Sequence, residues 1–396
     1  MSTQNPIFIP GPTNIPEELR RAIDFPTIDH RSPVFVEMLR PALDGVKRIL
    51  KTQHGDALIF PSTGTGAWEA AINNTLSPGD VVLAARHGMF SHRWIDMCNR
   101  HGLEVQMIEE EWGRGAPADQ FEKALKADRS HQIRAVLVTH NETATGVRSD
   151  VAAVRRAIDA ANHPAMLFVD GVSSIASMDF RMDEWGVDIA ITGSQKGFML
   201  PAGLAILGIS PKAKQAMTAA KCSRCFFDFR DMLRANENGG FPYTPPVNLI
   251  RGLDLSIRLL EAEGLDNVFA RHFRIAEGIR EAVAAWGLSL CAKEPRLYSD
   301  TVSAVATPAG FDATRIVTHA ATKYGVAFGV GLGDVAGKVF RIGHLGSLTD
   351  VMALAGIATA EMVMVDLGLP VRLGSGVAAA QEHYRTSTGN VQMKAA

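Results

Sequence analysis

Short apolar runs alternate with amphipathic stretches through the first two-thirds of the chain. The runs have the length of buried strands, and the stretches between them carry apolar residues at helical spacing. The predicted strands are residues 57–60, 81–84, 104–108, 135–138, 165–169, 189–192 and 204–209. The predicted helices are residues 67–75, 92–101, 118–127 and 151–161. This βα alternation predicts an α/β fold with a mostly parallel seven-stranded sheet between helices.

The pattern changes after a long predicted helix over residues 245–263. Beyond it, helices and strands mix without strict alternation, as in an α+β domain. The predicted helices there are residues 268–286, 313–324 and 351–367, and the strands are 289–291, 302–307 and 339–342. The proline-rich start, up to Pro16, predicts an extended arm rather than a helix. We therefore predict an N-terminal arm over 1–20, a large domain over 21–264 and a smaller C-terminal domain over 265–396.

Length and charge narrow the class of protein. A chain of 396 residues exceeds one typical core, which agrees with two domains. Lys and Arg number 40 and Asp and Glu number 42, so the net charge is −2. This balance argues against a nucleic-acid partner and against a basic membrane-binding surface. The N-terminus lacks the pattern of a secretory signal, and no apolar run is long enough to span a bilayer, so we predict a cytoplasmic enzyme.

Lys196 follows one predicted strand, and Asp170 ends the strand before it. Alone, Asp170 is readily explained as a strand-end cap and Lys196 as a solvated loop residue. Together they are what pyridoxal 5'-phosphate (PLP) requires, namely an amine for a Schiff base and a carboxylate that keeps the pyridine nitrogen protonated. The pair predicts a PLP enzyme in which Lys196 and Asp170 are catalytic.

A turn of small residues follows the first predicted strand and opens a helix. At Thr63, Gly64 and Thr65 the backbone N–H groups can approach an anion, the hydroxyls add donors, and the helix dipole favours negative charge. This turn predicts the phosphate seat of the cofactor. The alternative is a dinucleotide-binding turn, whose G-x-G-x-x-G pattern fails at Glu69.

Three further residues stand where ligand contacts are expected. Phe90, in a turn after the second strand, is placed to stack on a planar cofactor, or else fills the core. Thr143 follows a strand at the edge where open α/β sheets bind ligands, and its hydroxyl contacts either the phenolic oxygen of the cofactor or only its own turn. Arg341 lies in or beside a strand, where a guanidinium needs an anion. We predict that Arg341 binds a substrate carboxylate, with a structural salt bridge as the alternative.

Other potential ligands are weaker. Cys222 and Cys225 form a CxxC pair, but no second pair and no paired histidines are near, so we predict no metal site. A redox pair is possible in principle, and two reduced surface thiols are the favoured interpretation. The histidines His30, His140 and His344 are more simply explained as hydrogen-bonded structural residues than as catalytic ones.

Seven segments, taken in order, resemble those of a known family. They are Pro10-Gly-Pro-Thr-Asn14, Ser62-Thr-Gly-Thr-Gly66, His140-Asn-Glu-Thr-Ala-Thr-Gly146, Asp170-Gly-Val-Ser-Ser174, Gly193-Ser-Gln-Lys196, Tyr243-Thr-Pro-Pro246 and Gly337-Lys-Val-Phe-Arg-Ile-Gly343. Over nearly its whole length the chain resembles the class V, fold-type I PLP-dependent aminotransferases of the alanine/serine–glyoxylate group. It looks most similar to the bacterial serine–glyoxylate enzymes and their aspartate–glyoxylate relatives.

The resemblance implies a homodimer whose active sites use both subunits. Lys196 would be the Schiff-base lysine, Asp170 the pyridinium partner, and Arg341 the group that binds the α-carboxylate, with Asn14 nearby. The remaining cofactor contacts would be Thr63, Gly64 and Thr65 at the phosphate, Phe90 and Val172 on the ring faces, Thr143 at the ring oxygen, Gln195 beside the lysine, and Tyr243 and Thr244, with Thr244 reaching the phosphate from the other subunit. The implied reaction is ping-pong transamination through an aldimine on Lys196.

The implied substrates are glyoxylate, which becomes glycine, and an amino donor. L-Aspartate is slightly favoured over L-serine, and an alanine–glyoxylate enzyme is a further alternative. Gln195 argues against a cysteine desulfurase, which carries a histidine at that place, and a phosphoserine aminotransferase would need more basic residues. Aspartate would also need a reader for its side-chain carboxylate, for which Arg31, Arg224 and His344 are the candidates.

Three positions depart from the animal alanine–glyoxylate branch. Thr65 stands where that branch has histidine, Phe90 where it has tryptophan, and Phe241 where it has a phosphate-contacting tyrosine. Tyr243 is a candidate to replace that tyrosine. These changes affect cofactor contacts rather than the expected chemistry.

Overall fold

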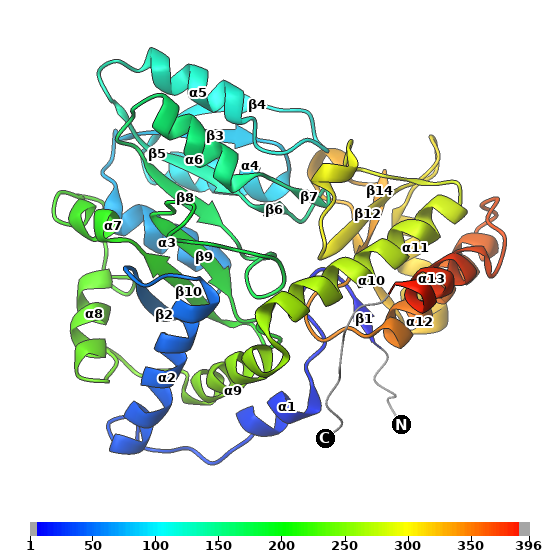
Figure 1. The fold of residues 1–396 in the computed structure, drawn as a ribbon, viewed down its shortest axis with the longest axis horizontal. Coiled ribbons are helices and arrows are strands. Elements are labelled where there is room, and N and C mark those ends of the chain that lie inside the picture. The colour runs from blue at the N-terminus through cyan, green and yellow to red at the C-terminus, as the bar shows by residue number, and fades with distance from the viewer. Residues whose placement is uncertain (1–5, 388–396) are drawn as a thin grey trace.

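The structure, a computed structural model, describes residues 6–387. Its larger sheet has the strand order β2-β10-β9-β8-β5-β3-β4 (Figure 1). The strands are β2 (Asp56–Ser62), β3 (Val81–Arg86), β4 (Glu104–Glu109), β5 (Ile133–Thr139), β8 (Met166–Asp170), β9 (Ile189–Gly193) and β10 (Gly203–Ile209). Only β10 runs antiparallel to its neighbours. The predicted mostly parallel seven-stranded sheet is confirmed.

The side chains on the two faces of this sheet belong to two separate apolar clusters. Along β5, Val136 and Val138 belong to one cluster, and Ala135 and Leu137 belong to the other, because successive side chains point to opposite faces. The first face is covered by α2 (Pro33–Ile49), α5 (Ala118–Ala127), α6 (Val151–Ala160) and α9 (Val247–Glu263). The second is covered by α3 (Gly64–Thr75), α4 (Met89–Arg100), α7 (Pro211–Ala216) and α8 (Phe229–Glu237).

Helix α2 was not predicted from the sequence. Pro33 suits the first turn of a helix, but Pro41 lies inside it, where it removes a backbone donor and disguises the helical pattern. The helix nevertheless extends over 17 residues, because Phe35, Leu39 and Val46 are fully buried in the apolar cluster on this face of the sheet. Tertiary burial outweighs the local cost of the proline.

The smaller sheet has the order β1-β13-β14-β12-β11. Its strands are β1 (Ile7–Phe8), β11 (Ser289–Leu290), β12 (Val302–Ala306), β13 (Ala327–Val330) and β14 (Val339–Gly343). The helices α10 (Leu265–Ala285), α11 (Thr314–His319), α12 (Asp350–Asp366) and α13 (Ser375–Thr386) pack with it in one apolar cluster. A π-helical turn (Ala320–Tyr324) continues α11. In Figure 1 this part lies beside the larger sheet, with α10 crossing in front.

The N-terminal arm joins the smaller sheet. Strand β1 pairs in parallel with β13, so that Ile7 faces Ala327 and Phe8 faces Phe328. After Pro16 the chain forms the short helix α1 (Glu17–Ile23). A break at Gly264, whose φ of +87° favours glycine, separates α9 from α10. The predicted domain limit at 264/265 falls on this break, and both predicted limits, at 20/21 and 264/265, remain predictions.

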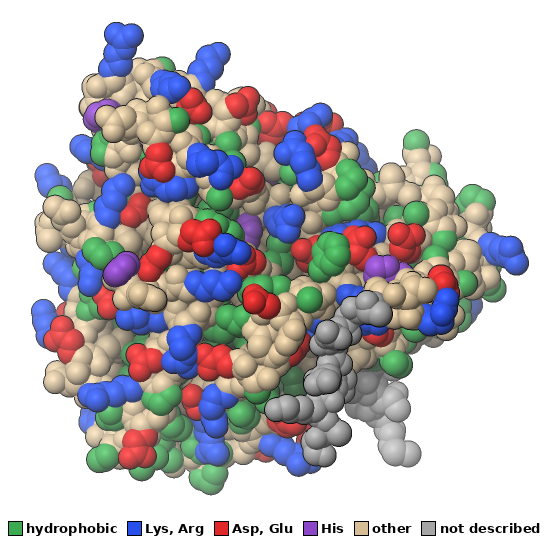
Figure 2. All heavy atoms as spheres, viewed as in Figure 1, with side chains coloured by type: hydrophobic (Ala, Val, Ile, Leu, Met, Phe, Trp, Pro, Cys, Tyr) green, Lys and Arg blue, Asp and Glu red, His purple; other side chains and the backbone are tan. Residues whose placement is uncertain are grey.

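Two short strands follow β5 in the chain. They are β6 (Asn141–Glu142) and β7 (Val147–Arg148), which pair in antiparallel fashion. On the face shown in Figure 2, basic and acidic side chains are intermixed. Among the helices within residues 6–387, none combines the length and the apolar content needed to cross a bilayer.

Candidate active site

Asp170 and Lys196 meet at the carboxyl edge of the larger sheet. Strands β8 and β9 are parallel neighbours, and their register pairs Asp170 with Ile191. Because β9 continues to Gly193, the chain reaches Lys196 just beyond the end of β8. The negative charge of Asp170 raises the pKa of Lys196, and the lysine in turn lowers the pKa of the acid, so the two charges are near one another.

Asp170 is a buried carboxyl, only 4% exposed. Burial raises the pKa of Asp170 to about 7, and the nearby charge of Glu142 acts in the same direction. The N–H of Val172 donates to the carboxylate at 2.9 Å and opposes the shift. A carboxyl whose pKa is about 7 becomes fully ionised when a cation is placed against it, because the cation lowers that pKa. Asp170 is therefore suited to hold a protonated ring nitrogen.

Lys196 has a readily deprotonated amine. Burial lowers the pKa of Lys196 to about 8, and the positive charge of Arg341 contributes to the decrease. Its Nζ donates to the carbonyl of Pro10, in the N-terminal arm. Thr13 also joins the arm to the lysine turn, because its N–H donates to the carbonyl of Gln195 and its hydroxyl to the carbonyl of Lys196, both at 3.2 Å. The arm therefore covers the lysine.

Gly11 is the point at which the arm passes closest to the lysine. Its φ is +107°, a region that favours glycine, and a Cβ added there would lie only 2.6 Å from Lys196 Nζ. The sequence placed this glycine in a family motif but gave no sign of its contact with Lys196, which is far away along the chain.

The predicted phosphate seat is the N-terminus of α3. Thr63 precedes the helix in an extended conformation, and its side chain makes no capping hydrogen bond, so the first-turn N–H groups point toward the site without a side-chain acceptor. Thr65 is exposed. Gly64 has no room for a side chain, because a Cβ there would collide with Cγ2 of Val172. The turn, its donors and Val172 thus form one surface.

Gln195 lies against the same turn. A Cβ added at Gly193 would lie 2.9 Å from Gln195 Oε1 and 3.3 Å from the amide nitrogen of Gly64. Within residues 6–387, Gln195 Oε1 is buried and has no hydrogen-bond partner. A buried polar atom without a partner is costly, which is the condition expected where a bound group supplies the missing contact.

Arg341 lies in β14 and is 6% exposed. Its Nε donates to the carbonyl of Val330 at 2.8 Å, and its Nη1 donates to the carbonyl of Thr143 at 3.0 Å. Burial lowers the pKa of Arg341 to about 10. In the described part of the chain it forms no salt bridge, so the structural ion pair considered as an alternative is not found. The guanidinium is a buried cation held by two carbonyl groups and able to accept an anionic ligand.

Thr143 belongs to a buried polar network. Its hydroxyl lies 2.7 Å from the Ser173 hydroxyl. The side-chain amide of Asn141 donates to Ser173 Oγ at 2.8 Å and to Thr301 Oγ1 at 3.0 Å. The network ties the ends of β5 and β8 to the smaller sheet. The predicted contact of Thr143 with a cofactor oxygen stays a prediction.

The comparison with known proteins identifies the family. The family described as Aminotransferase class-V matches residues 27–334. The chain belongs to the class-V aminotransferases. It is 71% identical, over the full length of both chains, to an L-aspartate–glyoxylate aminotransferase of Paracoccus denitrificans. It is 55% identical to a serine–glyoxylate aminotransferase of Hyphomicrobium methylovorum, over 96% of this chain and 94% of that one.

A solved structure supports the same assignment. The crystal structure of a pyridoxamine–pyruvate aminotransferase from Mesorhizobium loti matches with a TM-score of 0.89 and 28% identity, covering 97% of this chain and 98% of that one. The predicted family, the fold-type I architecture, the aminotransferase class and the PLP cofactor are confirmed.

The residues of this aminotransferase fit PLP at the positions predicted. The N-terminus of α3 offers backbone donors for a phosphate, Val172 adjoins that turn, and Gln195 Oε1 lacks a partner. Asp170 supplies an ionisable carboxyl and Lys196 an amine of lowered pKa. Which side chains contact the cofactor is a prediction that this agreement supports.

Other predicted site residues of the aminotransferase lie in different surroundings. The side-chain amide of Asn14 is bonded to Ile7, since it donates to the Ile7 carbonyl at 2.9 Å and accepts from the Ile7 N–H at 3.0 Å. The Tyr243 hydroxyl donates to the carbonyl of Phe226, and the rings of the two residues stack on one another. Thr244 is exposed. Asn14 therefore holds the arm, and whether the other two reach a cofactor depends on a second subunit.

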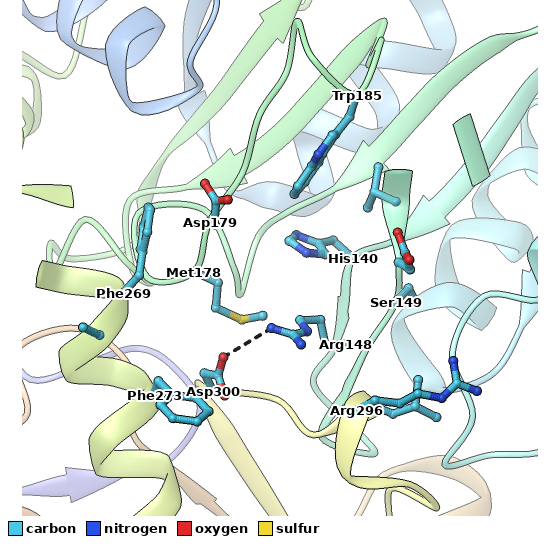
Figure 3. A pocket seen from close by; sticks show the side chains of 14 residues that line it. His140, Arg148, Ser149, Met178, Asp179, Trp185, Phe269, Phe273, Arg296 and Asp300 are labelled. Carbon is cyan, nitrogen blue, oxygen red and sulfur yellow. Dashed lines mark ion pairs between the residues drawn. The ribbon is translucent and has the colours of Figure 1, made fainter. Parts of the chain in front are cut away.

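His140 lines a separate cavity of about 620 Å³ between the two sheets (Figure 3). Burial lowers the pKa of His140 to about 3, and its ring packs edge-on against Trp185. None of the predicted cofactor contacts lines this cavity. His344, with hydrogen bonds to Ser303 and to the Asp300 carbonyl, is also surrounded by protein. Both surroundings agree with structural roles.

Proposed function

We propose that this aminotransferase converts glyoxylate to glycine, with L-aspartate as the favoured amino donor and L-serine as the alternative. The observation that carries the proposal is the 71% identity, without a gap in coverage, to an L-aspartate–glyoxylate aminotransferase. The serine–glyoxylate relatives match at 47–55% identity, which supports glyoxylate as the shared acceptor. An alanine donor, a phosphoserine substrate and a desulfurase reaction have less support.

The α-carboxylate is the group that every candidate substrate shares. Arg341 is placed to bind it, because its guanidinium is buried, carries no ion-pair partner within residues 6–387, and is held in orientation by the carbonyls of Val330 and Thr143. A planar fork binds a carboxylate through two hydrogen bonds. Glyoxylate is so small that its carboxylate is the main group by which the enzyme can bind it.

PLP supplies an electron sink that stabilises negative charge at the substrate α-carbon. Asp170 keeps a positive charge on the ring nitrogen by remaining ionised against it. Lys196 carries protons, since its amine has a pKa of about 8 and can both accept and release a proton near neutral pH. The arm, through Pro10 and Thr13, holds the lysine and limits access of water from that side.

A dimer would bring a second set of residues to each site. Tyr243 lines a hollow of about 240 Å³ that also contains His30 and Arg31, and Thr244 is the next residue of the chain. The family resemblance implies that Thr244 would contact the phosphate of the neighbouring subunit. Arg31, which lines the hollow with Tyr243, would accompany Thr244 across the interface. Two copies of the chain are therefore proposed to complete one another's sites.

Arg31 is proposed to read the side-chain carboxylate of aspartate. Of the three candidates, His344 is buried among protein groups, and Arg224 donates to the carbonyls of Asn73, Ala220 and Met217. Arg31 is exposed, and in the described chain its guanidinium makes no hydrogen bond or ion pair. It is the one candidate free to bind a ligand's second carboxylate.

Steady-state rates test the proposal. The purified enzyme is supplied with PLP and glyoxylate, and glycine is measured with L-aspartate, L-serine or L-alanine as donor. The proposal expects glycine in each of the first two reactions and the highest kcat/KM with aspartate. A higher kcat/KM with serine would favour the alternative donor. No glycine with any of the three donors would refute the proposed acceptor.

A further inference from the structure

Glu142 is a fully buried carboxylate beside the cofactor edge of the sheet. It accepts hydrogen bonds at the N-terminus of α4, from the N–H of Phe90 at 3.1 Å and from the N–H of Ser91 at 2.9 Å. Its other oxygen accepts from the N–H of Ala144 at 3.1 Å. One side chain thus satisfies unpaired donors of a helix end and closes the turn that contains Thr143.

Gly88 makes room for this carboxylate. It precedes α4, and a Cβ added there would collide with Cγ and Cδ of Glu142 and lie 2.6 Å from Oε2. The backbone at Gly88 is extended, with a φ of 175°, so it does not itself require glycine. The glycine is needed for the close approach of Glu142.

The two segments that Glu142 joins carry predicted ligand contacts. On one side stands Phe90, which is expected to lie against the cofactor ring. On the other side stands Thr143, whose carbonyl accepts from Arg341 Nη1 at 3.0 Å. Movement of the carboxylate would displace both segments. The N–H of Phe90 donates to it directly, and the N–H of Ala144, which also donates to it, belongs to the peptide unit of the Thr143 carbonyl.

We propose that Glu142 is a positioning residue, which fixes the Phe90 ring for the cofactor and the Thr143 carbonyl for Arg341 at the same time. The proposal rests on the proposed function, in that it takes Phe90 as a cofactor contact and Arg341 as the carboxylate binder. It gives a task to a buried acid that the sequence did not single out.

The charge of Glu142 acts on the same groups. It raises the pKa of Asp170 and opposes the decrease in the pKa of Arg341 that burial causes. Within residues 6–387 no acid forms an ion pair with Arg341, and Glu142 is the acid whose charge raises the pKa of Arg341. Glu142 is the negative charge that offsets the buried guanidinium before a substrate binds.

Glu361 offers a matched control. It is 2% exposed and accepts backbone N–H groups at the start of a helix, from Gly374 at 2.8 Å and Gly376 at 2.5 Å. It also accepts from the indole of Trp286 at 2.9 Å. These contacts join α12 to α13 and to the end of α10, and they involve none of the predicted site residues. Glu361→Gln therefore reproduces the loss of a buried helix-capping carboxylate without touching the site.

The experiment compares Glu142→Gln with Glu361→Gln in the purified enzyme. The PLP dissociation constant, and KM and kcat for the amino donor and for glyoxylate, are measured for each. Charge-assisted hydrogen bonds of this kind change equilibria by about tenfold to a hundredfold when one partner is removed. We expect PLP to dissociate at least tenfold more readily from Glu142→Gln and KM to rise for both substrates, while Glu361→Gln changes the melting temperature alone.

A double-mutant cycle tests whether the effect passes through Phe90. In a Phe90→Ala background, Glu142→Gln should weaken PLP binding little further, because the positioned ring is already absent. Gly88→Ala provides a second route, since it displaces the same carboxylate and should weaken PLP binding in the same direction, even if Glu142→Gln fails to fold.

Two results would overturn the proposal. One is unchanged PLP affinity and KM in a folded Glu142→Gln enzyme. The other is an equal loss of PLP affinity in Glu361→Gln, which would show a general effect of stability. The PLP measurement does not depend on the amino donor, so an error in the proposed substrates would leave this test intact.

Discussion

The Nη1 atom of Arg341 donates to the carbonyl of Thr143 at 3.0 Å, which joins the smaller sheet to the edge of the larger one. Arg341 lies in β14 and Thr143 follows β6. The contact fixes the orientation of the buried Arg341 guanidinium. A substrate carboxylate bound by Arg341 would therefore be placed relative to Lys196 and Asp170, which belong to the larger sheet.

Arg341→Ala should lower kcat/KM for every substrate alike. Loss of a buried, hydrogen-bonded charged partner costs about 2–5 kcal/mol, which corresponds to some tens to thousands of fold. Arg341→Lys should recover little, because a point charge does not replace the planar fork. Arg296→Ala is the control, since Arg296 is exposed and, within residues 6–387, forms an ion pair with Glu294 alone. Damage confined to aspartate would make Arg341 the side-chain reader and contradict the assignment.

Capture of PLP by the cofactor-free enzyme should depend on pH through Lys196. The pKa of this lysine is lowered from 10.5 to about 8, so the neutral amine appears as pH rises through about 8. The rate of covalent capture, followed by absorbance, should rise between about pH 7 and 9 and then level off. Asp170→Asn removes a charge that raises this pKa, so the midpoint should move down, and transamination should fall by orders of magnitude.

A blocked lysine analogue in solution is the control for this profile. Its rate should go on rising toward its ordinary pKa, because no protein surrounds its amine. An enzyme profile that followed the free lysine would show that burial does not act on Lys196 as described.

Gly11→Ala should damage activity more than an equally strained substitution elsewhere. A Cβ at Gly11 would lie 2.6 Å from Lys196 Nζ, so the arm must move away from the lysine. Gly79 is the matched control, because its φ of +86° imposes similar backbone strain while nothing lies within 4 Å of an added Cβ. We expect comparable losses of melting temperature and a fall in kcat for Gly11→Ala alone. Equal kcat values for the two variants would remove the arm from the site.

Arg31→Ala should separate the amino donors. It should raise KM for aspartate by about tenfold or more, and leave serine and glyoxylate much less affected, because only aspartate carries a second carboxylate. Mixing the variant with Lys196→Ala subunits tests the shared site, since a hybrid dimer regains one complete site if Arg31 acts across the interface. Hybrids whose KM for aspartate stays as high as that of the Arg31→Ala homodimer would place Arg31 in its own subunit's site.

The strands and the pair Asp170 and Lys196 were predictable for one physical reason. Buried parallel strands are nearly continuous apolar runs, and polar residues at their carboxyl ends gather at one edge of the sheet. The helix α2 escaped prediction because Pro41 interrupts its pattern, and burial of its apolar face decides the outcome. Local pattern alone does not register such burial.

The contacts that complete the site could not be predicted in this way. Pro10 and Lys196 are 186 positions apart, and their contact depends on β1 joining the smaller sheet. Glu142 lies within a family motif, but its role follows from the three N–H groups that donate to it, two of which come from α4. Signals of this kind arise only when distant segments are brought together.

Reduction with borohydride is the most direct test of the central claim, that the chemistry of this aminotransferase takes place on PLP held by Lys196. The enzyme is saturated with PLP, reduced, digested and mapped by mass spectrometry, with Lys196→Ala treated in parallel. We predict one labelled peptide, with the pyridoxyl group on Lys196, and neither label nor turnover in the variant. A label on another lysine, or full activity in Lys196→Ala, would contradict the account.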